Sequence, residues 1–600
     1  MLPETKRIVP DPPQIDPQER ASLDVWGFTD TRFRARPDGV VELTGSRYAL
    51  CGQELRDLLP WVRRTIHPDV SPENVNPSHY PPPIPEARTH AAFTDEIGKA
   101  LGEDAVATEP EIRLRHGHGH TQEEMYAIKY ERLERVPDCV VYPQSEEQVV
   151  ALVEAARRHD VCLVPYGGGT NVSEALRCPQ GDERFLVSVD MSRMNRILWI
   201  DPVNHTAHIQ AGAVGRHLVA QLAHYGFTLG HEPDSIEFST LGGWIATHAS
   251  GMKKNRYGNI EELVLDATVV TARGVLERSS AAPRESIGVL DARRWIFGSE
   301  GVFGIVTSAV VKIFPLPERQ LYGSVLFPSF ESGVGFLYAL TRGGSRPASM
   351  RLVDNLQFQL SQTLKARRHG LKKRIGAFEK WFVTRVKGFR PEQMTACTLV
   401  FEGSRREVAE QQKSVYRIAK LFGGLESGAA NGERGYQLTF GIAYLRDWVM
   451  NHFILAESFE TSVSWSELLP LCENVKRRIH EECAQRGVPG TPFVTCRVTQ
   501  TYETGVCVYF YFAFYFKGVE RPSHVFAEIE RAARDEVLRS GGSLSHHHGI
   551  GKIRRDFLPR VASPATLEWS RLIKTAVDPT NIFGAGNQSF ADGSSAQEPE

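Results

Sequence analysis

The sequence predicts an α+β fold made of several domains, since 600 residues exceed the usual size of one domain. A helical pattern over about 145–158 leads into the apolar run 161–166, which stops at the glycines 167–169. Further glycine-rich turns between short apolar runs follow, and strand-like and helix-like patterns alternate through the second half. Short strands and helices mixed in this way give an α/β or α+β architecture, and we expect α+β.

Composition limits the function classes. Hydrophobic residues make up 41% of the chain and charged residues 24%, which is ordinary for a globular protein. The formal net charge of −2 argues against nucleic acid as the main partner. The nine cysteines show no CxxC spacing, which suits a reducing compartment. No apolar run reaches transmembrane length and residues 1–13 lack a signal-peptide core, so we expect a chain that does not span a membrane.

Residues 1–134 are predicted to form a partly helical N-terminal domain. Residues 1–20 are rich in proline and charge, and helical patterns lie near 51–66 and 91–103. The domain ends in the alternating histidines and glycines of 116–120. Such a run can bind a metal, but no cysteine or carboxylate lies nearby with ligand spacing, so we predict no metal site.

The turn after residue 166 is the predicted centre of a ligand site. Ser145 and Gln148 have the spacing of a capping box, so the helix begins near 145 and runs into the strand that precedes the glycines. Three glycines carry no Cβ, and their backbone N–H groups can therefore approach an anion closely. An ordinary tight turn explains the three glycines equally well. Neither a Walker A loop nor a GxGxxG motif is present.

Other glycine-rich segments lie downstream, at 230–235, 241–244 and 297–307. Several such turns suit a long, phosphate-bearing cofactor that is held along its length. Lys253 and Lys254 could contribute to phosphate binding, and a solvated loop is an equally good interpretation.

The region 318–560 is predicted to be a second α+β domain. Its stretch 365–387 interleaves basic and bulky apolar residues, which fits either an interfacial helix on an anionic lipid surface or a solvated basic helix. The aromatic run 507–516 reads as a buried strand, on which Tyr509 and Tyr511 share one face. Adjacent side chains diverge on an extended segment, so at most two of the histidines 546–548 can face one site. Acid/base or phosphate-binding roles suit these histidines better than metal binding.

The glycine motifs together resemble a known type of cofactor domain. PYGGGTN (165–171), the internal GGW (242–244) and GSEGVFGIVT (298–307) look like the FAD-binding domain of the vanillyl-alcohol oxidase / p-cresol methylhydroxylase superfamily. DPTNIFG (578–584) resembles the C-terminal segment of its FAD-linked oxidase branch. The resemblance implies a two-part FAD-binding domain at 135–317 and a large α+β cap at 318–560. It further implies an FAD-proximal segment at 561–588 and a disordered tail at 589–600.

The resemblance also implies which residues hold FAD. One of the histidines in 116–120 would touch the cofactor, and His248 replaces a more usual arginine. The expected FAD-binding residues are Pro165, Tyr166, Gly167, Gly168, Gly169, Thr170, Asn171, His231, Asp234, Ser235, Ile236, Glu237, Phe238, Ser239, Thr240, Thr247, His248, Ala249, Ser250, Ser299, Glu300, Gly301, Val302, Phe303, Gly304 and Ile305.

The cap motifs resemble a single family over about residues 26–583. GHEPDS, SMRLVDN, AYLRD, YFYFAF and GGSLSHHHG are similar to those of the alkylglycerone-phosphate synthases. The resemblance implies exchange of the acyl chain of acyl-dihydroxyacetone phosphate for a long-chain fatty alcohol, which forms the ether bond of ether lipids. FAD would hold the substrate covalently without a net redox cycle, and a covalent intermediate divides one difficult step into two easier ones.

The same resemblance assigns roles in the cap. Tyr509 would be the general acid/base that moves the substrate's α-proton, which requires a lowered pKa or a nearby cation. Arg446 would bind the substrate phosphate, for which arginine supplies a bidentate fork. Arg351, His546, His547 and His548 would be needed for activity as phosphate ligands or charge stabilisers.

Two other functions compete with this one: an FAD-linked 2-hydroxy-acid oxidase or dehydrogenase, and a catalytically silent FAD-stabilised scaffold. The family further implies a peripheral position on a membrane surface, a homodimer and contact with the acyltransferase that makes the substrate. It implies the peroxisomal lumen as the compartment, although the C-terminus AQEPE is not a peroxisomal address. A bacterial member would be cytoplasmic and membrane-peripheral.

Overall fold

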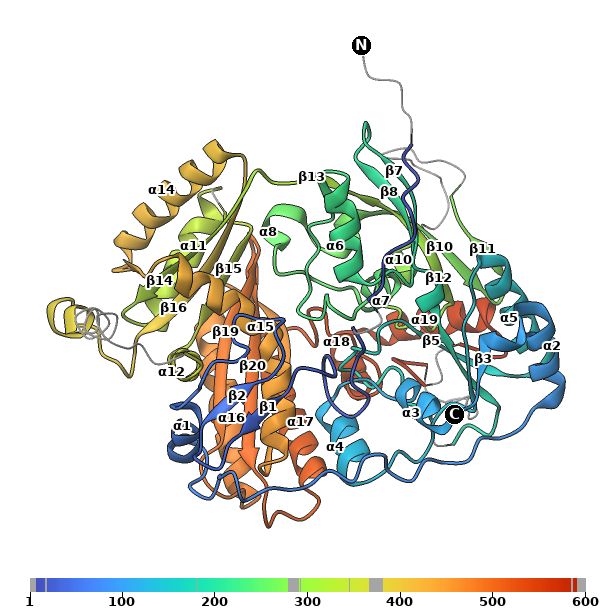
Figure 1. Ribbon diagram of the computed structural model, residues 1–600, viewed down its shortest axis with the longest axis horizontal. Helices are drawn as coiled ribbons and strands as arrows, with labels where there is room; N and C mark the ends of the chain where they lie inside the picture. The colour runs from blue at the N-terminus through green and yellow to red at the C-terminus, as the bar shows by residue number, and fades with distance from the viewer. Residues whose placement is uncertain are drawn as a thin grey trace.

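The computed structural model describes residues 7–16, 19–179, 181–278, 291, 293–344, 346–365, 381–583 and 586–590. Residues 366–380 of the basic stretch, Gly584 of the C-terminal motif and residues 591–600 of the predicted tail lie outside the described residues. The remaining chain forms two lobes, seen on the right and left of Figure 1. We call them the first lobe, built on the four- and five-stranded sheets, and the second lobe, built on a seven-stranded sheet.

The four-stranded sheet of the first lobe carries the glycine loop. Its order is β3-β4-β6-β5, and β4, β6 and β5 run parallel. Ser145 caps α5 by accepting from the Gln148 N–H, as the sequence predicts, and α5 leads directly into β5. The second half of the predicted capping box does not form, because the Gln148 side chain accepts from the Gln144 N–H instead. Helix α2 packs beside α5 in the same hydrophobic cluster. The bounds are α2 (Ala91–Leu101), β3 (Val106–Ala107), β4 (Cys139–Val141), α5 (Glu146–His159), β5 (Cys162–Tyr166) and β6 (Leu186–Asp190).

The five-stranded sheet of the first lobe is antiparallel, in the order β11-β10-β12-β8-β7. Its own hydrophobic cluster includes Trp244 of α7 and Leu218 of α6. The bounds are β7 (Ile197–Asp201), β8 (Thr206–Gln210), α6 (Gly215–His224), β9 (Phe227–Thr228), α7 (Leu241–Thr247), α8 (Lys254–Tyr257), α9 (Ile260–Leu263), β10 (Val264–Thr271), β11 (Gly274–Leu276), α10 (Arg293–Ile296), β12 (Ile305–Lys312) and β13 (Phe314–Pro315).

The second lobe is an antiparallel sheet in the order β17-β14-β16-β15-β19-β20-β18. Helices α11, α14, α16 and α17 cover one face, and α12 and α15 cover the other. The bounds are β14 (Arg319–Phe327), α11 (Phe330–Arg342), β15 (Ser349–Val353), α12 (Asn355–Thr363), β16 (Thr395–Gly403), α14 (Arg405–Leu421), β17 (Leu425–Glu426), α15 (Ala429–Met450), β18 (Ile454–Ser464), α16 (Leu468–Gln485), β19 (Phe493–Thr501), β20 (Gly505–Tyr515) and α17 (Pro522–Arg539).

Strand β20 shows how the aromatic run 507–516 is used. Phe510, Phe512 and Phe514 belong to the hydrophobic cluster under the covering helices. Tyr509 and Tyr511 alternate with them and line a cavity on the opposite side. The prediction of a buried strand with both tyrosines on one face is therefore confirmed.

The N-terminal residues contribute to both lobes. Strands β1 and β2 and helix α1 join a cluster with α15, β19 and β20 of the second lobe, whereas α2 and β3 belong to the first (Figure 1). Helix α4 contacts α17 and β18. The bounds are β1 (Phe33–Ala35), β2 (Val41–Leu43), α1 (Leu58–Thr65), α3 (Pro110–His116) and α4 (Gln122–Tyr130).

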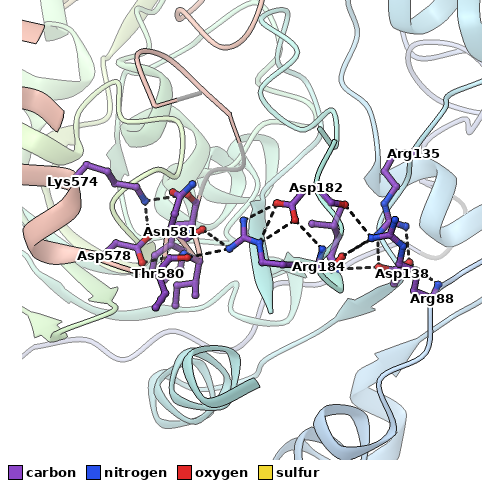
Figure 2. Close-up of polar contacts among 12 residues, drawn as sticks. Arg88, Arg135, Asp138, Asp182, Arg184, Lys574, Asp578, Thr580 and Asn581 are labelled. Carbon is purple, nitrogen blue, oxygen red and sulfur yellow. Dashed lines mark hydrogen bonds and ion pairs between the residues drawn. The ribbon is translucent and has the colours of Figure 1, made fainter. Parts of the chain in front are cut away.

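The C-terminal segment returns to the first lobe and is held there by polar contacts (Figure 2). Arg184, beside β6, donates to the carbonyl oxygens of Thr580 and Asn581 at 3.1 and 2.9 Å. Lys574 of α19 (Pro564–Val577) reaches Asp578 Oδ2 at 2.5 Å and the Val302 carbonyl at 2.7 Å. These contacts fix the chain after α18 (Leu558–Val561) and α19 against the glycine turn near 301. Among the described helices, none combines the length and apolar character needed to cross a bilayer.

Candidate active site

A cavity of about 370 Å³ lies where the two lobes meet. The glycine loop 167–169 and the turns around 234, 249 and 300 line it from the first lobe. Helix α15 and strands β18, β19 and β20 line it from the second lobe. Backbone donors, titratable side chains and an apolar wall therefore meet in one space.

The glycine loop is shaped for a close-lying anionic ligand. A Cβ at Gly168 would lie 2.1 Å from the Phe238 carbonyl oxygen, so no larger residue fits there. Gly169 has φ +67°, a conformation that favours glycine. Within the described part of the chain, the backbone N–H groups of both glycines donate to no acceptor. Unpaired N–H groups that line a cavity are the donors that a dinucleotide's phosphates need.

Most of the expected FAD-binding residues line this cavity. Those that do are Pro165, Tyr166, Gly167, Gly168, Gly169, Thr170, Asn171, Asp234, Ser235, Ser239, Thr240, Thr247, Ala249, Ser250, Ser299, Glu300, Gly301, Gly304 and Ile305. Those outside its lining are His231, Ile236, Glu237, Phe238, His248, Val302 and Phe303.

The two histidines in the second group have other surroundings. His248 Nε2 lies 3.2 Å from Glu261 Oε2, and both residues line a separate, more open pocket. His231 is buried edge-on against Trp244, and burial lowers its pKa to about 3. Neither ring nitrogen of His231 has a hydrogen-bond partner among the described residues. His231 is thus a neutral imidazole behind the cavity wall.

Tyr509 lies in the middle of the second-lobe wall. The register pairs it with Arg497 on β19 and with Glu460 on β18. Its hydroxyl lies 2.6 Å from Nε2 of His547, and the Arg497 guanidinium lies 4.9 Å from its ring centre. Burial raises the pKa of Tyr509 above its usual value, in spite of the nearby Arg497. The resting group is a neutral phenol, so an acid/base role requires His547 to take up its proton.

The three consecutive histidines form a loop around Glu460. The fully buried Glu460 carboxylate accepts the N–H groups of His546, His547 and His548 at 2.5, 3.2 and 2.8 Å. His547 and His548 line the main cavity, whereas His546 lines the open pocket. This divergence was expected for neighbouring residues on an extended segment.

Glu460 and Cys507 also place possible ligand atoms within 4.8 Å of those of His546 and His547. Each of the two imidazoles already contacts a tyrosine hydroxyl at 2.6 Å, and Glu460 is occupied by the loop. We therefore assign this cluster to proton chemistry rather than to a metal.

Arg446 of α15 is buried at the cavity with one donor atom available. It donates to Asp447 Oδ1 at 3.0 Å, to the His120 carbonyl at 2.7 Å and to Glu457 Oε2 at 3.3 Å. Its Nη2 is buried and has no hydrogen-bond partner among the described residues. Burial raises the pKa of the neighbouring Glu457 to about 7, against the opposing effect of Arg446. A ligand anion therefore meets the spare Nη2 donor of a guanidinium whose charge is offset by Asp447 and only in part by Glu457 near neutral pH.

Arg351 lies behind the cavity wall rather than in its lining. It donates to the two carboxylate oxygens of Asp234 at 3.1 and 3.3 Å and also binds Thr439. Arg497 donates to Asp234 Oδ2 at 3.0 Å. The two arginines lower the pKa of Asp234 even though its burial opposes this. Arg351 can therefore act on the cavity through Asp234.

The histidines at 116–120 are separated by the fold. His116 Nε2 lies 2.8 Å from Asp190, and His118 Nδ1 lies 2.7 Å from the Gly119 carbonyl. Only His120 of the three lines the cavity, edge-on to Trp26 with ring centres 4.9 Å apart. His120 is thus the one in a position to touch a ligand.

The ammonium groups of Lys253 and Lys254 contact other groups of the protein. Lys253 Nζ lies 2.7 Å from Glu402 Oε1 and 3.2 Å from Glu232 Oε2. Lys254 Nζ donates to the Thr501 carbonyl at 3.1 Å and lies 3.5 Å from the Tyr502 ring centre. Neither lines the main cavity, so the structure supports neither phosphate binding there nor a free solvated loop.

One wall of the cavity is apolar. It is formed by α1, α12, α15, β18, β19 and β20, and its residues belong to one hydrophobic cluster. The lining members of that cluster are Trp26, Leu58, Trp61, Val62, Ile66, Leu360, Ile442, Ala443, Leu445, Val449, Ile454, Ala456, Phe493, Tyr511 and Ala513. A site with such a wall beside Arg446 suits an anionic head carrying a hydrocarbon chain.

Sequence reasoning assigned no role to Arg497, Glu460, Glu457 or Tyr502. Of these four residues, Arg497 could have been predicted from the sequence, because an arginine between apolar residues of a buried strand requires a partner. Glu460 and Glu457 become significant only through the pairing of β18 with β20. Nothing in a single strand's pattern reveals that pairing.

Comparisons with known proteins agree with the fold. Residues 137–280 match the model of the FAD binding domain, and residues 316–587 match that of the C-terminal domain of FAD linked oxidases. The solved structure of p-cresol methylhydroxylase with substrate bound superposes with a TM-score of 0.60 at 16% identity, over 84% of this chain and 98% of that one. The fold is thus of the vanillyl-alcohol oxidase / p-cresol methylhydroxylase type, and the protein is an FAD-dependent enzyme. The unpaired N–H groups of the glycine loop fit that cofactor.

The relatives define the family more narrowly. The chain is 42% identical to the alkyldihydroxyacetonephosphate synthase of Caenorhabditis elegans over 584 residues, which cover 96% of both chains. A solved alkyldihydroxyacetonephosphate synthase superposes with a TM-score of 0.82 at 28% identity, over 95% of this chain and 99% of that one. The chain belongs to the alkyldihydroxyacetonephosphate synthase family, also called the alkylglycerone-phosphate synthases.

Proposed function

We propose that this protein exchanges the fatty acyl group of acyl-dihydroxyacetone phosphate for a long-chain alcohol, releasing the fatty acid and forming the alkyl ether. The main structural support is the composition of one cavity. It joins the glycine cradle, the Tyr509–His547 pair, the unpaired Nη2 of Arg446 and an apolar wall. A phosphate head, a reacting carbon and a hydrocarbon chain each have a matching surface there.

Arg446 is the proposed phosphate ligand. Its Nε and Nη1 are held by Asp447, the His120 carbonyl and Glu457, so the guanidinium is fixed before a ligand arrives. A fixed guanidinium with a spare donor can bind a phosphate oxygen with little further ordering.

The apolar wall is the proposed binding surface for the acyl and alkyl chains. Trp61 of α1 and Phe493 of β19 meet edge-on there, with ring centres 5.8 Å apart. Burial of a methylene group contributes about 0.8 kcal/mol, so a chain of about ten carbons can supply most of the binding energy. The acyl chain and the alkyl chain are both hydrocarbons, so one apolar surface can bind either of them during the exchange.

Tyr509 is the proposed group that handles the substrate's α-proton. Bound FAD supplies an electron-accepting ring beside the substrate. The Tyr509 hydroxyl donates its proton to His547 Nε2 as its oxygen accepts the proton from the substrate carbon. Arg497 stabilises negative charge that develops on the phenol oxygen, since its guanidinium lies against the same ring.

A peripheral membrane position is a further proposal. The described end of the basic stretch exposes Trp381 and Phe382, which are 52% and 37% solvent-accessible. Aromatic side chains next to lysines and arginines suit the headgroup region of a bilayer. Flotation with vesicles of anionic and neutral lipid would test this, and equal recovery with both would contradict it. A peroxisomal location, a homodimer and contact with an acyltransferase stay predictions from the family.

The test of the reaction is an anaerobic product assay. The FAD-loaded protein receives acyl-dihydroxyacetone phosphate and hexadecanol, and the alkyl ether and the free fatty acid are quantified. We expect the two products in equal amounts over many turnovers. Absence of ether, together with lasting flavin bleaching by a 2-hydroxy acid, would contradict the proposal and favour the competing oxidase.

A further inference from the structure

Beyond the cavity, a continuous row of polar side chains leads from Tyr509 to the protein surface. We propose that His547, His546 and Tyr502 form a proton relay that connects Tyr509 with water in the open pocket beside Asn259 and Glu261. The inference rests on the proposed role of Tyr509 and adds a route and a residue, Tyr502, to it. It explains why two of the consecutive histidines face different pockets.

The distances along the row are those of direct hydrogen bonds. The Tyr509 hydroxyl lies 2.6 Å from His547 Nε2, and His547 Nδ1 lies 2.8 Å from His546 Nδ1. His546 Nε2 lies 2.6 Å from the Tyr502 hydroxyl. Each imidazole thus contacts its two neighbours through its two different ring nitrogens, as a relay requires, and every gap is short enough for a proton to cross.

One arrangement of protons satisfies every contact. Tyr509 donates to His547 Nε2, His547 Nδ1–H donates to His546 Nδ1, and His546 Nε2–H donates to the Tyr502 oxygen. The remaining proton, that of the Tyr502 hydroxyl, is then available to pocket water. Both imidazoles are neutral in this arrangement, and burial lowers the pKa of His546 to about 3 and that of His547 below its usual value.

Proton transfer along the row conserves atoms and charge. When the Tyr509 oxygen accepts the α-proton, the substrate C–H bond breaks and each O–H or N–H bond along the row is replaced by one on the next residue. One proton enters the pocket water, and the electron pair of the C–H bond stays on the substrate side. When the hydroxyls and imidazoles have reoriented, a proton from water can pass inward along the same row, so the hydrogen that returns to the substrate carbon need not be the one removed from it. No oxidant or reductant is required.

The outer end of the relay is built for contact with water. The open pocket has a volume of about 620 Å³, and Tyr502 and His546 both line it. Asn259 Nδ2 donates to the Tyr502 oxygen at 3.3 Å, and Ser250 donates to Asn259 Oδ1 at 2.7 Å. These contacts fix the hydroxyl of Tyr502 at the pocket.

The inner part is fixed as well. Glu460 binds the three loop N–H groups, so both imidazoles are carried on an anchored backbone. At the outer end, Lys254 Nζ lies 3.5 Å from the centre of the Tyr502 ring. The contacts that surround the row therefore hold its members in line.

The test follows a hydrogen isotope rather than the rate alone. Acyl-dihydroxyacetone phosphate carrying two deuterium atoms on the carbon between the acyl oxygen and the ketone is converted in ordinary water. The first shift leaves the abstracted deuteron on the Tyr509 oxygen, and a second shift along an intact relay, after its hydroxyls and imidazoles have reoriented, carries it outward in exchange for a proton from water, so wild-type product should lose most of one deuterium. In Tyr502→Phe the deuteron is confined to Tyr509 and the two histidines, so the product should retain it severalfold more often. His546→Gln interrupts the same row and should have the same effect.

Controls separate the possible failures. Tyr225→Phe removes a hydroxyl from a residue that lines neither pocket and should match wild type, and flavin content with thermal unfolding establishes that each variant folds. Equal deuterium loss in wild type and in both relay variants would overturn the relay while leaving the proposed function intact. A wild-type enzyme that forms ether over many turnovers but retains both deuterium atoms would likewise overturn the relay. If wild type forms no ether at all, the proposed function itself fails.

Discussion

The Arg351 guanidinium lies 3.1 Å from Asp234 Oδ1, behind the wall of the cavity that Asp234 lines. Arg497 binds the other oxygen of the same carboxylate at 3.0 Å. A residue expected from its motif to act on the substrate therefore acts through a neighbour. Asp234 is fixed from two sides, and what it contacts in the cavity is set by arginines on β15 and β19.

Removal of the Arg351 guanidinium should weaken the fold as well as the site. Arg351→Met leaves Asp234 with one arginine, and we expect a loss of about 2 kcal/mol in unfolding free energy. Loss of a partner from a fully buried pair costs about 3–5 kcal/mol, and the cost should be smaller here because the Asp234 side chain is 33% exposed at the cavity. Urea unfolding of the FAD-loaded protein measures this. Arg406→Met, which removes an exposed pair with Glu410, should change stability by less than about 0.5 kcal/mol.

Tyr509→Phe should lower the rate constant kcat about 10²- to 10⁴-fold, because the ring stays and only the proton-carrying hydroxyl is lost. Steady-state kinetics with the flavin spectrum recorded in parallel would show whether FAD stays bound. Tyr515→Phe is the matched control: it lies on the same strand, outside the cavity, with its hydroxyl on Asn74. A Tyr509→Phe enzyme with wild-type kcat would remove Tyr509 from the reaction.

Glu457 should make stability depend on pH in a defined direction. Burial raises its pKa to about 7, so between pH 4.5 and 7 the folded protein holds a proton that the unfolded chain has lost. The stabilisation that protonated Glu457 gives the folded protein is fully present below pH 4.5 and is lost as the pH rises through 7. Glu457→Gln cannot ionise, so its stability relative to wild type should increase over this range, by up to about 3 kcal/mol. Thermal unfolding at pH 4.5 and 8 measures the difference, and a pH-independent difference would refute it.

The C-terminal contacts of Figure 2 should be needed for stability. Lys574→Met leaves the fully buried Asp578 carboxylate without its cation, and we expect a loss of about 3–5 kcal/mol. FAD should also dissociate more readily, because Asn587 of the same segment lines the cavity. The exposed Lys413→Met provides the control. Unchanged thermal unfolding in Lys574→Met would show that the segment is held by its apolar contacts alone.

The apolar wall should determine chain length. Ala456 of β18 pairs with Ala513 of β20, and both line the cavity. Ala456→Leu places three more carbons in that space, so we expect kcat/KM for hexadecanol to fall about tenfold or more relative to a short-chain alcohol. Each variant's own activity with the short alcohol is the internal standard. An equal fall for both alcohols would indicate a general distortion instead.

Local sequence patterns predict much of the fold. The cap at Ser145, the strand that stops at three glycines and the alternation of Tyr509 with Phe510 are set by neighbours in the sequence, and the structure confirms each. The glycine cradle could be predicted for the same reason, since its backbone demands are local.

The rest of the site depends on pairing between distant segments. Glu460 lies opposite Tyr509 only because β18 and β20 pair in one particular register. Likewise, Arg351 reaches Asp234 across 117 residues of sequence. A shift of one residue would turn these side chains to the other face, and no feature of a single strand determines that register.

The most direct test of the proposed exchange reaction is the redox state of the flavin during turnover without oxygen. Ether-forming exchange requires no net transfer of electrons. After acyl-dihydroxyacetone phosphate and hexadecanol have been consumed over many turnovers, the absorbance of oxidised FAD should therefore return to its starting value. Permanent bleaching after a single equivalent of substrate, with no ether formed until an oxidant is added, would contradict the account and identify an oxidase.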